Sequence, residues 1–169
     1  MLRRTARALA SRLPLHYPAI TVVNSVFTQR LAHHTDAVPD YLLELTAAER
    51  TYTDLSVKTD RNIPVQLQLP PGTILRDGDW LRSRSGELAQ VRAKPEPVLT
   101  VTSLFPLALL QAAYQLGHRK IPLEITACYL RLSPDPALKA FLGQRGLRVI
   151  EEVAPFQPET YFEQRLYSI

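Results

Sequence analysis

The chain has 169 residues, of which 46% are apolar and 21% are charged, and it holds one cysteine. These fractions are near those of globular proteins, so they argue against disorder and predict one domain or two small ones. No apolar run approaches the roughly 18 residues that a membrane span needs, which predicts no membrane association. A lone Cys128 excludes an internal disulfide and a cysteine-based zinc site. Together these features predict a soluble, cytoplasmic protein.

The net charge of +4 comes entirely from the start of the chain. Residues 1–20 hold four arginines and no acid, whereas residues 21–94 hold nine basic and nine acidic side chains, and residues 95–169 hold seven of each. Binding of DNA or RNA needs lysines and arginines clustered on one face. The neutral remainder of the chain therefore predicts a protein that binds no nucleic acid.

The first twenty residues also differ from the rest in composition. They are rich in arginine, free of acids and interrupted by Pro14 and Pro18. Mitochondrial and chloroplast transit peptides share this composition. A disordered leader, or translation from a start site upstream of the true one, fits it as well. We expect residues 1–20 to lie outside the conserved fold, and these explanations remain open.

A series of short strands is predicted between residues 21 and 94. Val65, Leu67 and Leu69 alternate with two glutamines, which is the period of a half-buried strand. Residues 60–62 form a polar hairpin loop, and the glycines of 70–72 and 77–79 are typical of turns. No helical period of useful length is present, which predicts a small all-β domain. The expected strands are residues 21–27, 41–45, 51–57, 63–69 and 88–93.

The pattern changes after Lys94. Residues 98–101 read as a strand, and Ser103 is placed to cap a helix over 104–116 that Gly117 would end. Residues 120–126 and 128–132 follow as a hairpin.

A second helix and a last strand complete this half. The sequence Ser133-Pro134-Asp135 combines a capping hydroxyl, a proline for the first helical position and an acid near the helix N-terminus. Gly146 would end that helix, and residues 147–153 read as the last strand. The order β-α-β-β-α-β predicts a ferredoxin-like domain.

The predicted fold class is therefore α+β, with a small N-terminal all-β domain followed by a ferredoxin-like βαββαβ domain. We expect a leader at 1–20, a β domain at 21–94 that binds peptide or protein, a ferredoxin-like domain for metal binding and dimerisation at 95–155, and a tail at 156–169. Such folds carry many unrelated activities, so function has to be argued from sites.

Several candidate sites have simple structural explanations. The pair His33-His34 lies in a polar loop, where adjacent histidines are more often neutral than metal ligands. Asp77-Gly78-Asp79 is more typical of a turn than of a cation site. Strand alternation places at most one of Glu151 and Glu152 in solvent, and Cys128 is expected to be a small buried residue. None of these predicts a reaction.

His118 has the most informative position of the four histidines. It follows Gly117 at the predicted end of the first helix, with Arg119 and Lys120 beside it. Three cationic residue types there suit the negative end of a helix dipole. The functional alternative is a single imidazole ligand, which needs a symmetry mate to build a usable metal site.

A series of further segments carries a recognisable set of motifs: residues 27–31, 45–51, 69–79, 94–99, 113–117, 121–125, 130–136 and 151–159. These motifs resemble those of one family, the urease accessory protein UreE. They occur in the family's order and span about residues 26–159, and residues 27–31 resemble the family's opening strand.

The resemblance implies a homodimeric nickel chaperone rather than an enzyme. It implies delivery of Ni²⁺ to apo-urease for metallocentre assembly, together with a GTPase and other accessory proteins. The nickel would be transported cargo and not a catalytic cofactor, and no catalytic residue is expected. The family's metal ligand is a histidine at the dimer interface, in the motif Leu-Gly-Asn-Arg-His.

This chain departs from the family at that ligand. It reads Leu116-Gly117-His118-Arg119-Lys120, so Lys120 occupies the ligand position and the histidine stands two residues earlier. An ammonium group has no lone pair, so it cannot bind nickel until it is deprotonated. We therefore expect His118 to be the metal ligand. The family's histidine-rich tail is also missing, since residues 161–169 contain no histidine.

Two other readings remain. A divergent family member that has lost the ligand would act as a protein-binding scaffold. An enzyme of the small-phosphatase type on the ferredoxin-like unit would need an arginine and an amide around a bound anion, and no phosphate loop supports it.

Overall fold

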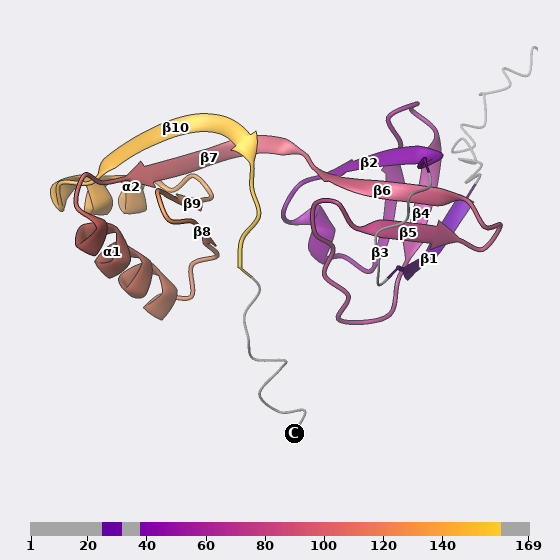
Figure 1. Cartoon of the computed structure of the whole chain (residues 1–169), viewed down its shortest axis with the longest axis horizontal. Coiled ribbons are helices and arrows are strands. Elements are labelled where there is room, and N and C mark those ends of the chain that lie inside the picture. The colour runs from indigo at the N-terminus through magenta and orange to yellow at the C-terminus, as the bar shows by residue number, and fades with distance from the viewer. Residues whose placement is uncertain (1–24, 32–37, 160–169) are drawn as a thin grey trace, which may run out of the picture.

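The computed structural model describes residues 25–31 and 38–159. Within these residues, strands predominate and two α-helices lie in the second half of the chain, so the α+β class is confirmed (Figure 1). The leader at 1–20, the pair His33-His34 and the tail beyond Glu159 fall outside the described residues.

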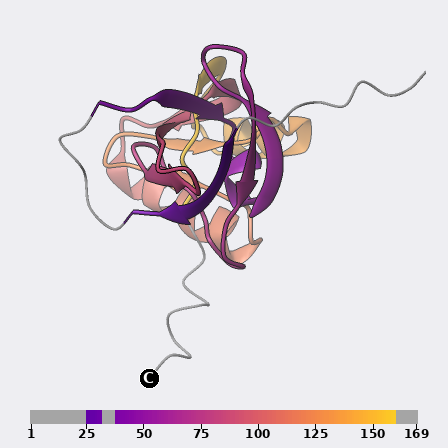
Figure 2. The same ribbon diagram turned by 90° about the vertical axis from the view of Figure 1, so that its right-hand side faces the viewer.

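The first sheet has the strand order β2-β6-β5-β1-β4-β3. The pairs β1–β4 and β2–β6 are parallel, and the other neighbours are antiparallel. Figure 2, seen from this half, shows the strands curling around a common interior. The elements are β1 (Ser25–Arg30), β2 (Tyr41–Leu45), the 3-10 helix η1 (Glu49–Thr51), β3 (Asp54–Lys58), β4 (Pro64–Gln68), β5 (Trp80–Ser83) and β6 (Leu88–Ala93).

This sheet encloses the first hydrophobic core. Alternation places Val65 and Leu67 of β4 on the inner face, where both are fully buried. Leu55 and Val57 of β3 are partly buried against this core. The other buried members come from the remaining strands and from the connection between β4 and β5, and they are Phe27, Leu43, Leu45, Leu69, Leu75, Leu81, Ala89 and Val91. The predicted hairpin between residues 51–57 and 63–69 is confirmed as the antiparallel pair β3–β4.

Two features of this half differ from the sequence prediction. Strand β5 (Trp80–Ser83) was not expected, because it is only four residues long and follows a turn. The strand expected from residue 51 begins at Asp54, because the preceding residues form η1. Glu49 stabilises that turn by accepting hydrogen bonds from the main-chain N–H and the hydroxyl of Thr46, a capping-box arrangement.

The second sheet has the order β10-β7-β9-β8, and all its neighbours are antiparallel. Leu99 and Val101 of β7 share one face, against which both helices pack in a single core. The elements are β7 (Pro95–Thr102), α1 (Pro106–His118), β8 (Glu124–Ile125), β9 (Leu130–Leu132), α2 (Pro136–Gln144) and β10 (Arg148–Pro155).

The ends of α1 differ from the prediction. The helix begins at Pro106 and has no side-chain cap, because the Ser103 hydroxyl accepts only the N–H of Phe105, which precedes the helix. The helix also continues through Gly117 to His118. It ends where Lys120 takes the left-handed conformation with φ of 59°, and the N–H of Ile121 then reaches the carbonyl of Leu116.

The start of α2 is shifted by two residues. Asp135, rather than Ser133, is the capping residue, since its carboxylate accepts hydrogen bonds from the N–H groups of Ala137 and Leu138. Pro136, rather than Pro134, is therefore the first helical residue. Gly146 follows the helix with φ of 77°, as its position predicted.

The long antiparallel pair β7–β10 leads from the first half of the molecule to the second (Figure 1). After β10 the chain returns toward the first half, where Phe156 is buried and contacts the side chain of Arg50. Among the described residues, neither helix is long and apolar enough to cross a membrane.

Candidate metal and docking site at the end of helix α1

His118 is the last residue of α1, and its side chain is exposed. It lies one helical turn after Tyr114, and the two rings stack with centroids 6.5 Å apart and planes 17° apart. This contact holds the imidazole against the helix. An exposed histidine in this place can donate a nitrogen lone pair to a metal ion.

A shallow pocket of about 340 Å³ adjoins this histidine. Its lining combines the stacked aromatic pair with polar and cationic groups from the ends of both helices: Tyr114, Gln115, His118, Arg119 and Arg145. The guanidinium carbons of Arg119 and Arg145 lie 4.3 and 4.5 Å from the centre of the Phe141 ring. One aromatic ring therefore contacts two cations, one from the end of each helix.

Lys120 occupies the position at which the resemblance places a metal ligand. Its left-handed backbone is what turns the chain out of α1. A non-glycine residue adopts this conformation at a steric cost. The requirements of the turn, rather than the lysine side chain, therefore determine the backbone conformation of Lys120. The fold thus places His118 on the helix itself and Lys120 in the turn beyond it.

A single imidazole makes a weak metal site. In the part of the chain that the structure describes, no three histidine, cysteine or acidic side chains gather as a metal-binding group. Among the described residues His118 thus has no companion ligands, and a firm metal site needs ligands from beyond them.

The exposed face of α1 carries a stripe of large apolar side chains. Leu107, Leu110 and Tyr114 are 65%, 67% and 76% exposed, and their spacing places them on the helix side that leads to His118. We call these three residues the α1 stripe. Leu104 and Phe105, just before the helix, are exposed as well. Apolar surface of this extent is typical of a protein interaction site.

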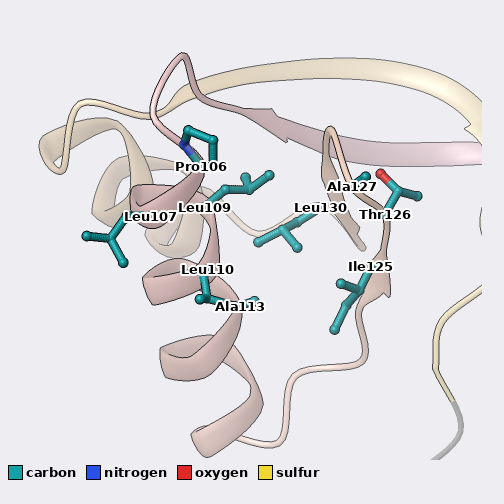
Figure 3. A pocket seen from close by; sticks show the side chains of 9 residues that line it. All are labelled: Pro106, Leu107, Leu109, Leu110, Ala113, Ile125, Thr126, Ala127 and Leu130. Atoms are coloured by element: carbon teal, nitrogen blue, oxygen red, sulfur yellow. The ribbon is translucent and has the colours of Figure 1, made fainter.

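The α1 stripe borders an apolar groove of about 460 Å³. Figure 3 shows the side chains of α1 on one side of this groove and those of the β8–β9 hairpin on the other. Ile125 and Leu130 line the hairpin side, and Leu109 and Ala113 line the helix side. The groove extends the apolar surface without adding a metal ligand.

The aspartates of the Asp77-Gly78-Asp79 segment act in a turn, as predicted. Asp77 accepts the N–H of Ala93, and Asp79 accepts the N–H of Arg76. Asp79 also forms an ion pair with Arg30, at 2.9 Å. Gly78 has φ of 82°, which explains the glycine.

Two predictions about exposure are wrong. Glu151 and Glu152 are both exposed, because β10 is an edge strand with one partner and leaves both of its faces partly open. Glu151 pairs with Lys139 of α2, whereas Glu152 pairs with Arg131 on the opposite face. Cys128 is exposed in the turn between β8 and β9 rather than buried in a strand.

The sheet face opposite the helices holds a polar network that fixes the outgoing chain. Arg131 pairs with Glu124 at 3.3 Å and donates to the carbonyl of Pro155. Glu124 also accepts the Tyr129 hydroxyl, and this hydrogen bond is the main cause of the raised pKa of Tyr129. These groups satisfy one another, which fits a structural role.

Sequence reasoning found His118 but missed its surroundings. The i, i+4 spacing of Tyr114 and His118 was a usable signal for their contact. The approach of Arg145 to Arg119 had no local signal, because the two residues are brought together only by the packing of α1 and α2 against one sheet.

Comparison with known proteins gives the same family along nearly the whole described chain. The family model for the N-terminal domain of the UreE urease accessory protein matches residues 27–94, and that for its C-terminal domain matches residues 96–166.

Individual relatives agree with the family models. A urease accessory protein UreE of Microcystis aeruginosa is 47% identical over 149 residues, covering 85% of this chain and 94% of the relative. Proteins of the same name from Nostoc punctiforme and Thermosynechococcus vestitus are each 48% identical, over 134 and 118 residues. Those alignments cover 79% and 69% of this chain, and 90% and 82% of the relatives. The chain belongs to the UreE family of urease accessory proteins and is an accessory protein rather than an enzyme.

Proposed function

We propose that the chain is a nickel chaperone that delivers Ni²⁺ for assembly of the urease metallocentre. The observation that carries this proposal is the exposed imidazole of His118 at the end of an exposed apolar helix face. Nickel favours imidazole ligands, and family membership supplies the link to urease. The nickel is cargo, and the proposed ligand is His118, not Lys120.

The proposed active form is a homodimer. Packing the α1 stripe of one copy against that of another would bury Leu107, Leu110 and Tyr114, all of which face solvent in the single chain. A two-fold contact is self-complementary, so it would bring both copies of His118 toward one axis. Two imidazoles from two chains then share one metal ion.

The remaining assignments follow from the same proposal. The β domain at 21–94 would bind peptide or protein, and 95–155 would be a ferredoxin-like unit, for which the element order and the strand order β10-β7-β9-β8 are the support. The partners would be apo-urease and other urease accessory proteins including the GTPase, in the cytoplasm, with no role for nucleic acid or membrane.

A second candidate function is a protein-binding scaffold that has lost its metal. It is favoured by the lysine at the family's ligand position and by the lack of a three-ligand group among the described residues. In that case the β domain would still bind proteins while nickel would not bind at all.

Reconstituted activation of apo-urease with limiting Ni²⁺ separates the two functions. Adding this chain should raise the yield of active urease, and His118→Ala should abolish the gain while leaving the fold intact. Lys139→Gln, which changes an exposed residue of α2 paired with Glu151, serves as the matched control. A His118→Ala variant that is as effective as the wild type would favour the scaffold.

A further inference from the structure

The pocket beside His118 has a second chemical character besides metal binding. Arg119 and Arg145 present their guanidinium groups around the ring of Phe141, so each group is partly fixed before any ligand arrives. Arginine recognises carboxylates through paired, parallel N–H donors, and fixing the group in advance reduces the entropy lost on binding.

These cations have no acidic partner in the described chain. The ion pairs between described residues involve Arg30, Arg131 and Lys139, and neither Arg119 nor Arg145 takes part in one. The sequence explains why: residues 97–123 and 136–150, which contain both helices, hold no aspartate or glutamate. The acids of this half lie on the strands and in the connections instead.

The ends of the helices offset only part of this charge. Arg119 and Arg145 are the residues that follow the last turns of α1 and α2, where each helix contributes roughly half a negative charge. Two helix ends together amount to about one negative charge, whereas the two arginines and the adjoining Lys120 carry three positive ones. A net positive pocket remains.

We propose that this pocket binds the carboxylates of an acidic segment on a partner protein. The two arginines that line the pocket, with Lys120 next to Arg119 in the chain, suit a ligand with several carboxylates better than one small anion. The two arginines follow the last helical residues and lie outside the α1 stripe that the proposed dimer buries, so they are left to a partner other than the second copy. The inference deepens the proposed function, on which it rests for the idea that the chain meets other proteins of urease assembly.

The test uses the full chain in nickel-free buffer with a chelator and a fluorescein-labelled hexaglutamate peptide, followed by fluorescence anisotropy. We expect saturable binding that weakens as salt is raised. The double variant Arg119→Gln/Arg145→Gln should weaken the affinity by about tenfold or more, since it removes both charged donors. Lys139→Gln, which removes one positive charge elsewhere on α2, should change it by less than about twofold.

Two further measurements test whether the pocket recognises carboxylates of a peptide specifically. Arg119→Lys/Arg145→Lys keeps the charge but not the paired donors, so its affinity should lie between those of the wild type and the glutamine variant. Inorganic phosphate at concentrations equal to the peptide should leave the peptide bound. Displacement of the peptide by equimolar phosphate would instead identify a site for small free anions and overturn the proposal.

The proposal also fails if Lys139→Gln weakens binding as much as the double glutamine variant, because the effect would then be one of net charge. Circular dichroism checks the fold, and the single variants, each with a smaller expected loss, replace the double variant if it unfolds. Since nickel is absent throughout, failure of this proposal is separate from failure of nickel binding at His118.

Discussion

The guanidinium of Arg50 donates a hydrogen bond to the main-chain carbonyl of Phe156, 106 residues further along the chain. A second nitrogen of the same group donates to the side-chain carbonyl of Gln157, at 2.6 Å. Arg50 is only 3% exposed, and burial is the main cause of its lowered pKa. This residue therefore ties the β domain to the segment that leaves β10.

Replacing Arg50 should destabilise the protein by more than a surface change does. In Arg50→Ala the buried carbonyl of Phe156 loses its arginine donor, and the side-chain oxygen of Gln157 keeps only the N–H of Asp77. This costs about 1–3 kcal/mol of unfolding free energy. Arg30→Ala is the control, because its exposed ion pair with Asp79 contributes at most about 1 kcal/mol. Urea denaturation measures both, and equal losses in the two variants would contradict the role given to Arg50.

Ser25 and Glu87 give a prediction about pH. The hydroxyl of buried Ser25 donates to the Glu87 carboxylate and is the main cause of the lowered pKa of Glu87. A carboxyl whose pKa is lower in the folded state stabilises the fold above its unfolded pKa, and this stabilisation is lost as the pH falls through the folded pKa. Ser25→Ala should therefore lower the melting temperature at pH 7.

The difference between wild type and Ser25→Ala should then shrink on acidification, from about pH 6 to about pH 3. Thermal melts at several pH values measure it. A difference that stays constant over this range would mean that Ser25 acts through packing and not through the charge of Glu87.

The N-cap of α2 predicts different effects on stability for Asp135 and Ser133. Asp135→Ala removes the acceptor of two N–H groups and should cost about 1 kcal/mol of unfolding free energy. Ser133→Ala should change it by less than about 0.5 kcal/mol, since that residue precedes the cap. Denaturant titrations check the pair, and the reverse order of effects would restore the sequence-based assignment of Ser133.

The left-handed conformation of Lys120, in the turn after α1, gives a prediction about stability. Lys120→Gly should raise the stability by about 1 kcal/mol, because glycine adopts the left-handed conformation without strain. Gly146→Ala should do the opposite: its φ is 77°, and no atom lies near the added methyl group, so only the backbone is strained. Thermal denaturation measures both. A loss of stability in Lys120→Gly would show that the lysine side chain holds the turn.

The sequence predicted most of the fold because its local patterns agree with the tertiary structure. The strands at 41–45 and 88–93 were placed to the residue, and alternation identified the inner face of β4. Errors arose where two local signals competed. Ser133-Pro134 and Asp135-Pro136 both fit a helix start, and only the geometry of α2 chooses between them.

The surroundings of the candidate site were less predictable. The balance of charge over residues 95–169 indicated a neutral half, yet packing segregates the cations Arg119 and Arg145 from the acids on the strands. The exposure of Leu107, Leu110 and Tyr114 could not be predicted from the sequence either. Helical periodicity predicts one buried apolar face, but it does not predict a second apolar face that stays exposed.

The central claim is that His118 binds nickel in a dimer. Isothermal titration of Ni²⁺ into the full chain, with the mass determined by light scattering on the same sample, tests it most directly. We predict one nickel per dimer, with loss of binding in His118→Ala and retention in Lys120→Gly. A dimer that takes up no nickel, or a His118→Ala variant that binds it as tightly as the wild type, would contradict the claim.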